Sequence, residues 1–363
     1  MSWLLAFLGF AALIVLHELG HFTAAKAVGM RVERFSLFFP PLVGRFRRGE
    51  TEYAVGAVPL GGYVKITGMN PAEEIPPEVA HRAYFRQPVW KRIVVIGAGP
   101  AVNIVLAFVI VTGYLQAYGA PEYRVTNQVE ALATNGASVG VLRLGDRVVA
   151  VDGVRGGPDK LREQVSRHTC AGTPENGCLA SSSALVTVER DGRQQSFRIA
   201  PVYSAADERP LLGFTYGAER YFVPVGGIGE ALTTSADYLW YVTTTTVDRL
   251  AGIFTDAEKR KEISGVVGTY EATRQSFELS ADRAILLLAV ISLSLGIINL
   301  FPFLPLDGGH IFWALAEKLR GRAIPFSVME RSGFIGFALV IALFAIGLTN
   351  DIGRLTGEGF DVR

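Results

Sequence analysis

The stretch ALIVLHELGHFTAAK, residues 12–26, places two histidines and a glutamate at the end of a run of apolar side chains. The apolar run suits lipid, but ionisable side chains at membrane depth are costly and by default mark a functional site. His17 and His21 stand four residues apart, so on a helix they share one face, about 6 Å apart along the axis. Two imidazoles so placed can bind one metal ion.

The composition supports a membrane setting. Half of the 363 residues are hydrophobic and 19% are charged, whereas charged residues make up about 25% of an average soluble chain. The formal net charge is only +1, and nucleic-acid binding would need a basic surplus on one face. We therefore expect the lipid bilayer as a partner, and no nucleic acid.

Four apolar segments approach the roughly 20 residues that a helix needs to cross a bilayer. We expect a polytopic α-helical membrane protein with spans in residues 1–27, 91–117, 283–310 and 332–349.

Short loops rich in Lys and Arg stay in the cytoplasm, and the loops at 28–90 and 311–331 carry such residues close to the spans. By this rule the long segment between the second and third spans lies outside, and so does the short tail at 350–363.

The outer segment contains alternating apolar residues around Gly-Asp and Asp-Gly pairs, at 135–154 and again at 185–202. This pattern predicts short strands joined by tight turns. The phrase GVLRLGDRVVAVDGV resembles a PDZ domain of the circularly permuted bacterial kind, which we place at 121–203; the alternative is another small β-rich domain. Residues 204–282 are expected to be a helical region at the outer interface. A fifth span at 227–254 is the alternative there.

Catalytic zinc usually takes three protein ligands and leaves one position open. A third ligand must lie at the depth of His17 and His21, and Asp307 in NLFPFLPLDGGH, residues 299–310, meets this condition. Pro302 and Pro305 are expected to break the helix before it. The alternative is that Asp307 is a polar cap at the end of a span. His310 lies past the glycines and is a poorer ligand. Glu18 projects beside the histidines, where it can take a proton from a metal-bound water.

The first cytoplasmic loop contains TEYAVGAVPLGGYVKI, residues 51–66, in which apolar and polar residues alternate around glycines. The pattern predicts a β-hairpin region. An exposed strand edge there could hold an unwound substrate through main-chain hydrogen bonds, although a plain solvated hairpin is the alternative.

Together these motifs resemble the site-2 protease family of intramembrane zinc metalloproteases. The resemblance rests on HELGH, on GPAVN at 99–103, on PLGGYVK at 59–65, on the PDZ-like insert and on NLFPFLPLDGG, in the order of the family. It is closest to the bacterial branch that cleaves anti-sigma factors.

The resemblance implies zinc bound by His17, His21 and Asp307, with Glu18 as the catalytic base. It further implies that the substrate is held by residues of the third span and the first loop, namely Asn299, Gly61, Gly62, Tyr63 and Val64.

The implied location is the bacterial cytoplasmic membrane, with the active site toward the cytoplasm and the PDZ-like domain outside. The implied substrates are single-span membrane proteins, of the anti-sigma-factor or remnant-signal-peptide type, trimmed first by another protease. We hypothesise that the PDZ-like domain admits only such trimmed substrates. Two other functions remain open: a non-enzymatic PDZ-bearing scaffold with a vestigial metal site, and a metal transporter.

Cys170 and Cys178 are the only cysteines, and both fall in the outer domain. Disulfides form and persist on the oxidising side of the membrane. The Gly, Pro and Asn residues between them favour a turn, so we expect a disulfide that closes this short loop; two free buried thiols are the alternative.

Overall fold

The structure, a computed structural model, describes residues 1–357 except 71–72, 134–135 and 254. It divides into two compact units. The first comprises Met1–Tyr118 and Val225–Arg363, and the second is Gly119–Pro224. The end of the expected tail, 358–363, lies outside the described residues.

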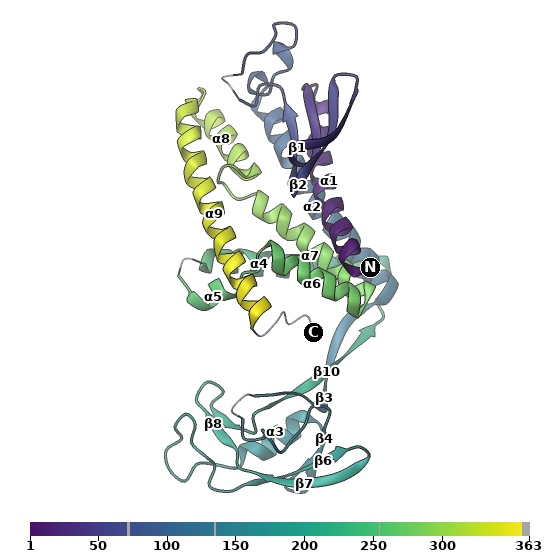
Figure 1. The fold of residues 1–363 in the computed structure, drawn as a ribbon, viewed down its shortest axis with the longest axis vertical. Helices are drawn as coiled ribbons and strands as arrows, with labels where there is room; N and C mark the ends of the chain where they lie inside the picture. The colour runs from purple at the N-terminus through teal and green to yellow at the C-terminus, as the bar shows by residue number, and fades with distance from the viewer. Residues whose placement is uncertain (71–72, 134–135, 254, 358–363) are drawn as a thin grey trace. The chain divides into compact units, whose positions relative to one another are not determined.

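Helices make up most of the first unit (Figure 1). The long ones are α1 (Ser2–Ala27), α2 (Val89–Tyr118), α4 (Ile228–Gly252), α7 (Ala281–Asn299) and α9 (Phe326–Thr356), and the shorter ones are α5 (Ala257–Glu262), α6 (Val266–Leu279) and α8 (Asp307–Arg320). Helix α2 packs against α1, α4, α7 and α8, so it is the centre of the bundle.

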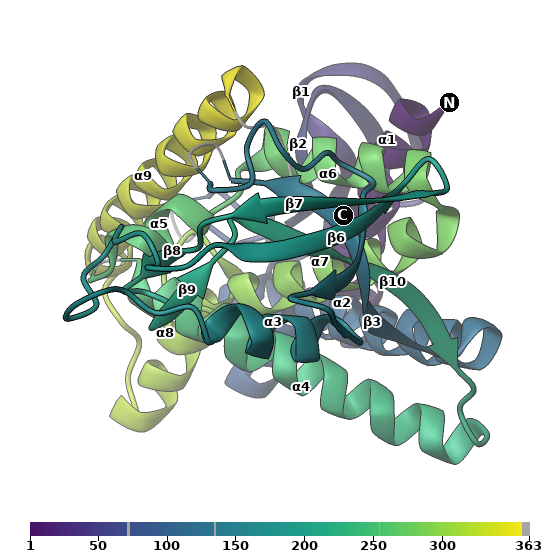
Figure 2. The same ribbon diagram turned by 90° about the horizontal axis from the view of Figure 1, so that it is seen from below.

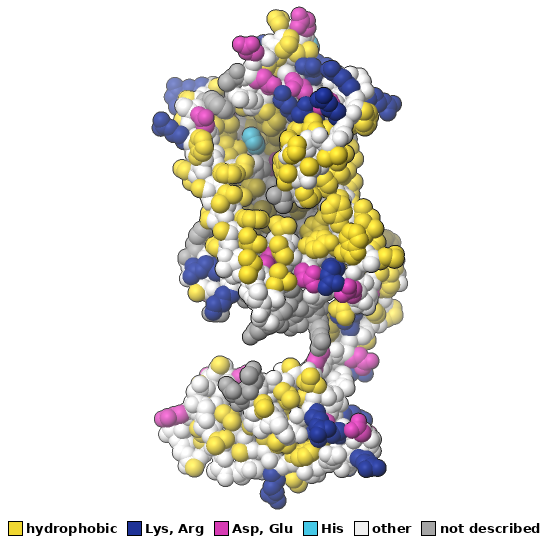
Figure 3. All heavy atoms as spheres, in the orientation of Figure 1, with side chains coloured by type: hydrophobic (Ala, Val, Ile, Leu, Met, Phe, Trp, Pro, Cys, Tyr) yellow, Lys and Arg dark blue, Asp and Glu magenta, His cyan; other side chains and the backbone are white. Residues whose placement is uncertain are grey.

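Four helices in the described part of the chain are long and apolar enough to cross a bilayer: Ser2–Ala27, Val89–Tyr118, Ala281–Asn299 and Ser327–Thr356. Their positions match the four expected spans. Figure 3 shows apolar side chains covering the middle of this unit, with charged side chains gathered toward its two ends. The chain thus has the element lengths and surface of a multi-pass membrane protein. Helix α4, which covers most of the alternative fifth span at 227–254, is not among these four helices.

A small sheet follows α1, built from β1 (Val32–Arg48) and β2 (Thr51–Ile66). Both strands bend back on themselves: Leu37 pairs with Gly62 on one side and Val55 on the other, and Tyr53 pairs with both Phe35 and Phe46. The register therefore orders four segments as 62–66, 32–37, 51–55 and 44–48. Two short 3₁₀ turns, η1 (Ala80–Arg82) and η2 (Tyr84–Arg86), lead from the sheet to α2.

The second unit is a six-stranded sheet with one helix. Its strands run in the order β10-β3-β4-β6-β7, with β5 paired to β4, and Figure 2 shows β6, β7 and α3 from below. The elements are β3 (Ala120–Leu132), β4 (Arg147–Val151), β5 (Val154–Arg155), α3 (Pro158–Ser166), β6 (Ala184–Arg190), β7 (Arg193–Ile199) and β10 (Phe214–Val223), with the small pair β8 (Val202–Ser204) and β9 (Arg209–Leu211) beside them. Its core is formed by side chains such as Val148, Val186 and Leu161.

Three expected boundaries are corrected. Residues 204–223, expected to be part of a helical region, carry β9 and β10, because β10 pairs with β3 along nearly its whole length. The expected loop at 311–331 is helical at both ends: residues 311–320 belong to α8, whose basic residues stand in its last turn, and residues 326–331 begin α9. The third span ends at Asn299, and Asp307 begins a separate helix. The break around Pro302 and Pro305 is as expected.

Candidate metal centre

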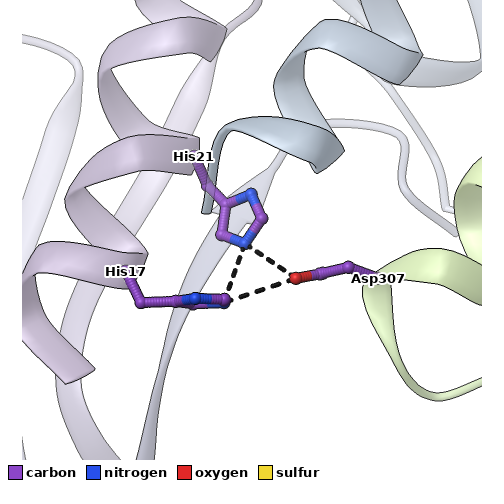
Figure 4. A group of neighbouring side chains, drawn as sticks. All are labelled: His17, His21 and Asp307. Atoms are coloured by element: carbon purple, nitrogen blue, oxygen red, sulfur yellow. Dashed lines mark hydrogen bonds and ion pairs between the residues drawn. The ribbon is translucent and has the colours of Figure 1, made fainter. Parts of the chain in front are cut away.

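Two helices bring the three expected ligands together. His17 and His21 lie on one face of α1 and Asp307 is the first residue of α8, and all three side chains point toward one another (Figure 4). Oδ2 of Asp307 is 3.3 Å from Nε2 of each histidine, and the two Nε2 atoms are 3.2 Å apart. Both histidines are buried. Residues 286 positions apart in the sequence thus form one cluster.

Close packing of α1 on α2 places the histidines at the centre of the bundle. A Cβ added to Gly20 would lie 2.6 Å from the carbonyl oxygen of Ala98, and one added to Gly99 would lie 2.9 Å from Nε2 of His17. Small residues let two helix backbones approach in this way. The glycines of HELGH and GPAVN therefore make room for the cluster, a role that the sequence analysis did not assign to them.

In each histidine, Nδ1, the ring nitrogen that does not face the cluster, has a partner on α2. Nδ1 of His21 is 2.9 Å from the carbonyl oxygen of Val95, and Nδ1 of His17 is 3.0 Å from the side-chain nitrogen of Asn103. Asn103 is fully buried. The structural role of Asn103 was not predicted from the sequence, in which the available signal is a strongly polar side chain within an apolar span.

The backbone before Asp307 holds the carboxylate in place. Residues 300–306 form an irregular turn that folds onto the start of α8: a Cβ on Gly308 would overlap the carbonyl of Leu300, and one on Gly309 would overlap the backbone of Leu304. On α9, Gly336 similarly faces the carbonyl of Leu304. The two glycines of LDGG are therefore required for this turn to pack against its own helix.

The three side chains fit a divalent metal ion. The ligand atoms lie within 4.8 Å of one another, and Oδ2 of Asp307 is buried without a hydrogen-bond donor among the described residues. The Val95 carbonyl only accepts hydrogen bonds, so the proton of neutral His21 is on Nδ1 and the lone pair of Nε2 faces the cluster. A tetrahedral site with metal–nitrogen distances of about 2.0–2.1 Å has ligand atoms roughly 3.3 Å apart, close to the observed separations. His17, His21 and Asp307 would hold the ion.

Glu18 lies next to the edge of the small sheet. A Cβ added to Gly62 would be 2.8 Å from Cγ of Glu18 and 2.9 Å from the carbonyl oxygen of Ser36. Of the expected substrate-binding residues, Gly62, Tyr63 and Val64 lie in the outermost segment of this sheet and Gly61 directly precedes it. Within the described residues this segment pairs with β1 alone. The structure thus brings the glutamate and the strand edge together.

Other expected residues lie outside the ligand cluster. Asn299 ends α7 and donates from its side chain to the carbonyl oxygen of Leu295, at 3.0 Å. His310 lies one turn beyond Asp307 on α8 and is not among the three clustered ligands. In the second unit, the structure pairs Cys170 with Cys178, the two residues of the expected disulfide, at a Cα separation of 6.4 Å.

The sequence matches Peptidase family M50 over residues 5–343. The chain belongs to this family. Membership confirms the expected resemblance to the site-2 proteases and places the protein among peptidases.

Several curated proteins are similar over nearly their whole length. "Putative zinc metalloprotease R01501" of Rhizobium meliloti is 30% identical, over 95% of this chain and 94% of its own length. "Putative zinc metalloprotease Cj1068" of Campylobacter jejuni is 28% identical, over 95% and 92%. "Regulator of sigma-E protease RseP" of Escherichia coli is 27% identical, over 94% and 96%.

Proposed function

We propose that this peptidase, a zinc metalloprotease, hydrolyses a peptide bond within or next to the membrane span of another protein. The observation that carries the proposal is the convergence of His17, His21 and Asp307 on one point among apolar helices, with Glu18 beside it. Relatives named as zinc metalloproteases support zinc as the ion.

Each side chain has one task in this reaction. The histidines and Asp307 hold zinc, which when bound polarises the scissile carbonyl and makes water more acidic. Glu18 accepts a proton from the attacking water and then delivers it to the leaving amine. Its place directly after His17 puts it within the turn of α1 that carries both histidine ligands.

The edge of the small sheet would hold the substrate. A helical substrate hides its carbonyls in its own hydrogen bonds and must be unwound before attack. Residues 61–64 offer main-chain groups on an edge that contacts Glu18, so an unwound segment could add to the sheet as another strand. Asn299 would assist by binding the scissile segment once its bond to Leu295 is released.

We further propose that the active site opens toward the cytoplasm of a bacterium and that the second unit, a PDZ-like domain, lies outside. The Lys- and Arg-rich loops around β1, β2 and α8 support this orientation. The substrates would be single-span proteins, of the anti-sigma-factor or remnant-signal-peptide type, whose outer parts another protease has removed. The relative named as a regulator of sigma-E supports this class.

Cleavage of a single-span reporter protein by the purified enzyme in lipid tests the activity. Removal of metal with a chelator should stop cleavage, and zinc should restore it. A preparation that cleaves equally well after metal removal would rule out the proposal.

We also propose that the PDZ-like unit acts as a filter, admitting only substrates whose outer parts have been removed. This is tested by replacing the whole unit, residues 119–224, with a short linker. The linker replaces the whole unit because a deletion ending at 203 would leave β10 without β3. Untrimmed reporter should then be cleaved at a rate near that of trimmed reporter. Continued rejection of untrimmed reporter would argue against a filter.

A further inference from the structure

The two proposed histidine ligands differ in the neighbouring group that decides which ring nitrogen carries the proton. His21 faces a backbone carbonyl, which can only accept, so its Nδ1 carries the proton. His17 faces the carboxamide of Asn103, which has an accepting end and a donating end. The end that faces His17 therefore decides whether its Nε2 presents a lone pair or a proton to the cluster.

The amide nitrogen of Asn103 lies 3.0 Å from Nδ1 of His17, and Oδ1 is buried with no hydrogen-bond partner among the described residues. If that nitrogen donates to Nδ1, the proton of neutral His17 stands on Nε2 and occupies the direction that a metal needs. Rotating the amide by 180° exchanges its oxygen and nitrogen, which are nearly the same in shape.

One amide atom is left unpaired in either orientation, so the carboxamide itself has little preference. The preference comes from His17. A metal on Nε2 forces the proton onto Nδ1, and this N–H needs an acceptor in a fully buried site. Among the described residues, the acceptor available to it is Oδ1 of Asn103, once the amide has rotated.

The backbone of Asn103 is held firmly enough for this task. Its carbonyl oxygen accepts a hydrogen bond of 2.9 Å from Ser292 on α7, and both residues are fully buried. Beside this bond, Gly296 of α7 packs against the carbonyl of Pro100. The carboxamide is thus presented to α1 from a backbone locked between two helices.

We propose that Asn103 is the positioning residue of the metal site: its Oδ1 accepts from Nδ1–H of His17 and so keeps Nε2 free to bind the metal. This inference rests on the zinc site proposed above. It assigns Asn103 no contact with the metal or the substrate.

Two substitutions separate hydrogen bonding from packing. Asn103→Leu keeps a similar size and removes the acceptor, whereas Asn103→Asp keeps an acceptor and adds a charge. We expect the Leu variant to bind Zn²⁺ about 10- to 100-fold more weakly and the Asp variant to stay within about threefold of the parent. A packing role predicts the opposite order, because a buried carboxylate is costly.

The readout is Zn²⁺ affinity of the full-length protein, measured by competition with a chromogenic chelator, together with the absorption spectrum of the Co²⁺-loaded form. Thr112→Val is the matched control, since it removes another buried hydrogen bond of α2, to Ser235 of α4, nine residues beyond Asn103; it should bind Zn²⁺ like the parent. A Leu variant that binds Zn²⁺ as tightly as the parent, or more tightly than the Asp variant, would overturn this inference and leave the proposed function standing. A parent protein that binds no Zn²⁺ would overturn the proposed function with it.

Discussion

The α-carbon of Gly99 faces the imidazole of His21 so closely that a methyl group there would overlap the ring, 2.6 Å from Cε1. The same methyl group would lie 2.9 Å from Nε2 of His17. The lack of a side chain at Gly99 of α2 thus leaves room at the point where the Nε2 atoms of both histidines converge.

Gly99→Ala should therefore abolish metal binding, because the added methyl group occupies the space beside both ligand atoms. Zinc content after purification, measured by elemental analysis, should fall at least tenfold. Gly97→Ala is the matched control, since a Cβ there meets only Cδ1 of Ile311 at an ordinary 3.9 Å. Equal zinc content in the two variants would place the metal elsewhere.

Asp307→Asn should weaken zinc binding and activity together, because a neutral amide is a much poorer ligand than a carboxylate. We expect at least a tenfold loss of affinity in the same chelator competition. If the variant kept the affinity of the parent, another residue would have to be the third ligand.

Gly62→Ala should lower the rate of cleavage while zinc stays bound. The new methyl group would press on Cγ of Glu18 and on the carbonyl of Ser36, so both the base and the strand edge must shift. Gly44→Ala, in the segment at the opposite edge, meets nothing within 4 Å and should behave like the parent. Comparable rates for both variants would mean that the edge at 61–64 does not serve the reaction.

A cluster of charges ties the small sheet to the end of α1. Glu50, in the turn between β1 and β2, accepts hydrogen bonds from Arg82 and from Lys26 of α1. Hydrogen bonding to Arg82, followed by that to Lys26, lowers the pKa of Glu50 to about 2. A carboxyl whose pKa is lowered by folding stabilises the fold above its unfolded pKa of about 4.3 and loses that contribution as the pH falls toward 2.

Glu50→Gln should lower stability at pH 7 by about 1 kcal/mol, since the group is partly exposed and screened by solvent. The difference from the parent should shrink as the pH falls from about 4.3 toward 2. Thermal unfolding in detergent across this range measures it, with the exposed Glu78→Gln as control. A difference that stays constant with pH would show that the charge of Glu50 contributes nothing.

The sequence predicted what depends on local pattern. The four apolar helices follow from runs of residues, and the meeting of His17, His21 and Asp307 follows from placing two motifs at the same depth. Three features depend on partners distant in the chain and have no such local pattern: the strand β10, the role of Gly99 and the role of Asn103. Strand β10 forms because it pairs with β3, some ninety residues earlier.

The roles of Gly99 and Asn103 appear only when α1 packs on α2. A glycine in an apolar helix does not by itself predict which residue packs against it, and a single asparagine does not predict which histidine it contacts. The basic residues near 318–322 predict a cytoplasmic loop by the charge rule. In the structure, Lys318 and Arg320 stand in the last turn of α8, where cations are favourable.

The most direct test of a zinc-dependent peptidase centred on α1 is the Glu18→Gln variant, with zinc content and cleavage of a single-span reporter measured on the same preparation. The expected result is a full complement of zinc with cleavage reduced by at least 10²-fold, because the base is lost and all three ligands remain. Cleavage near the parent rate in a zinc-loaded variant would contradict the account.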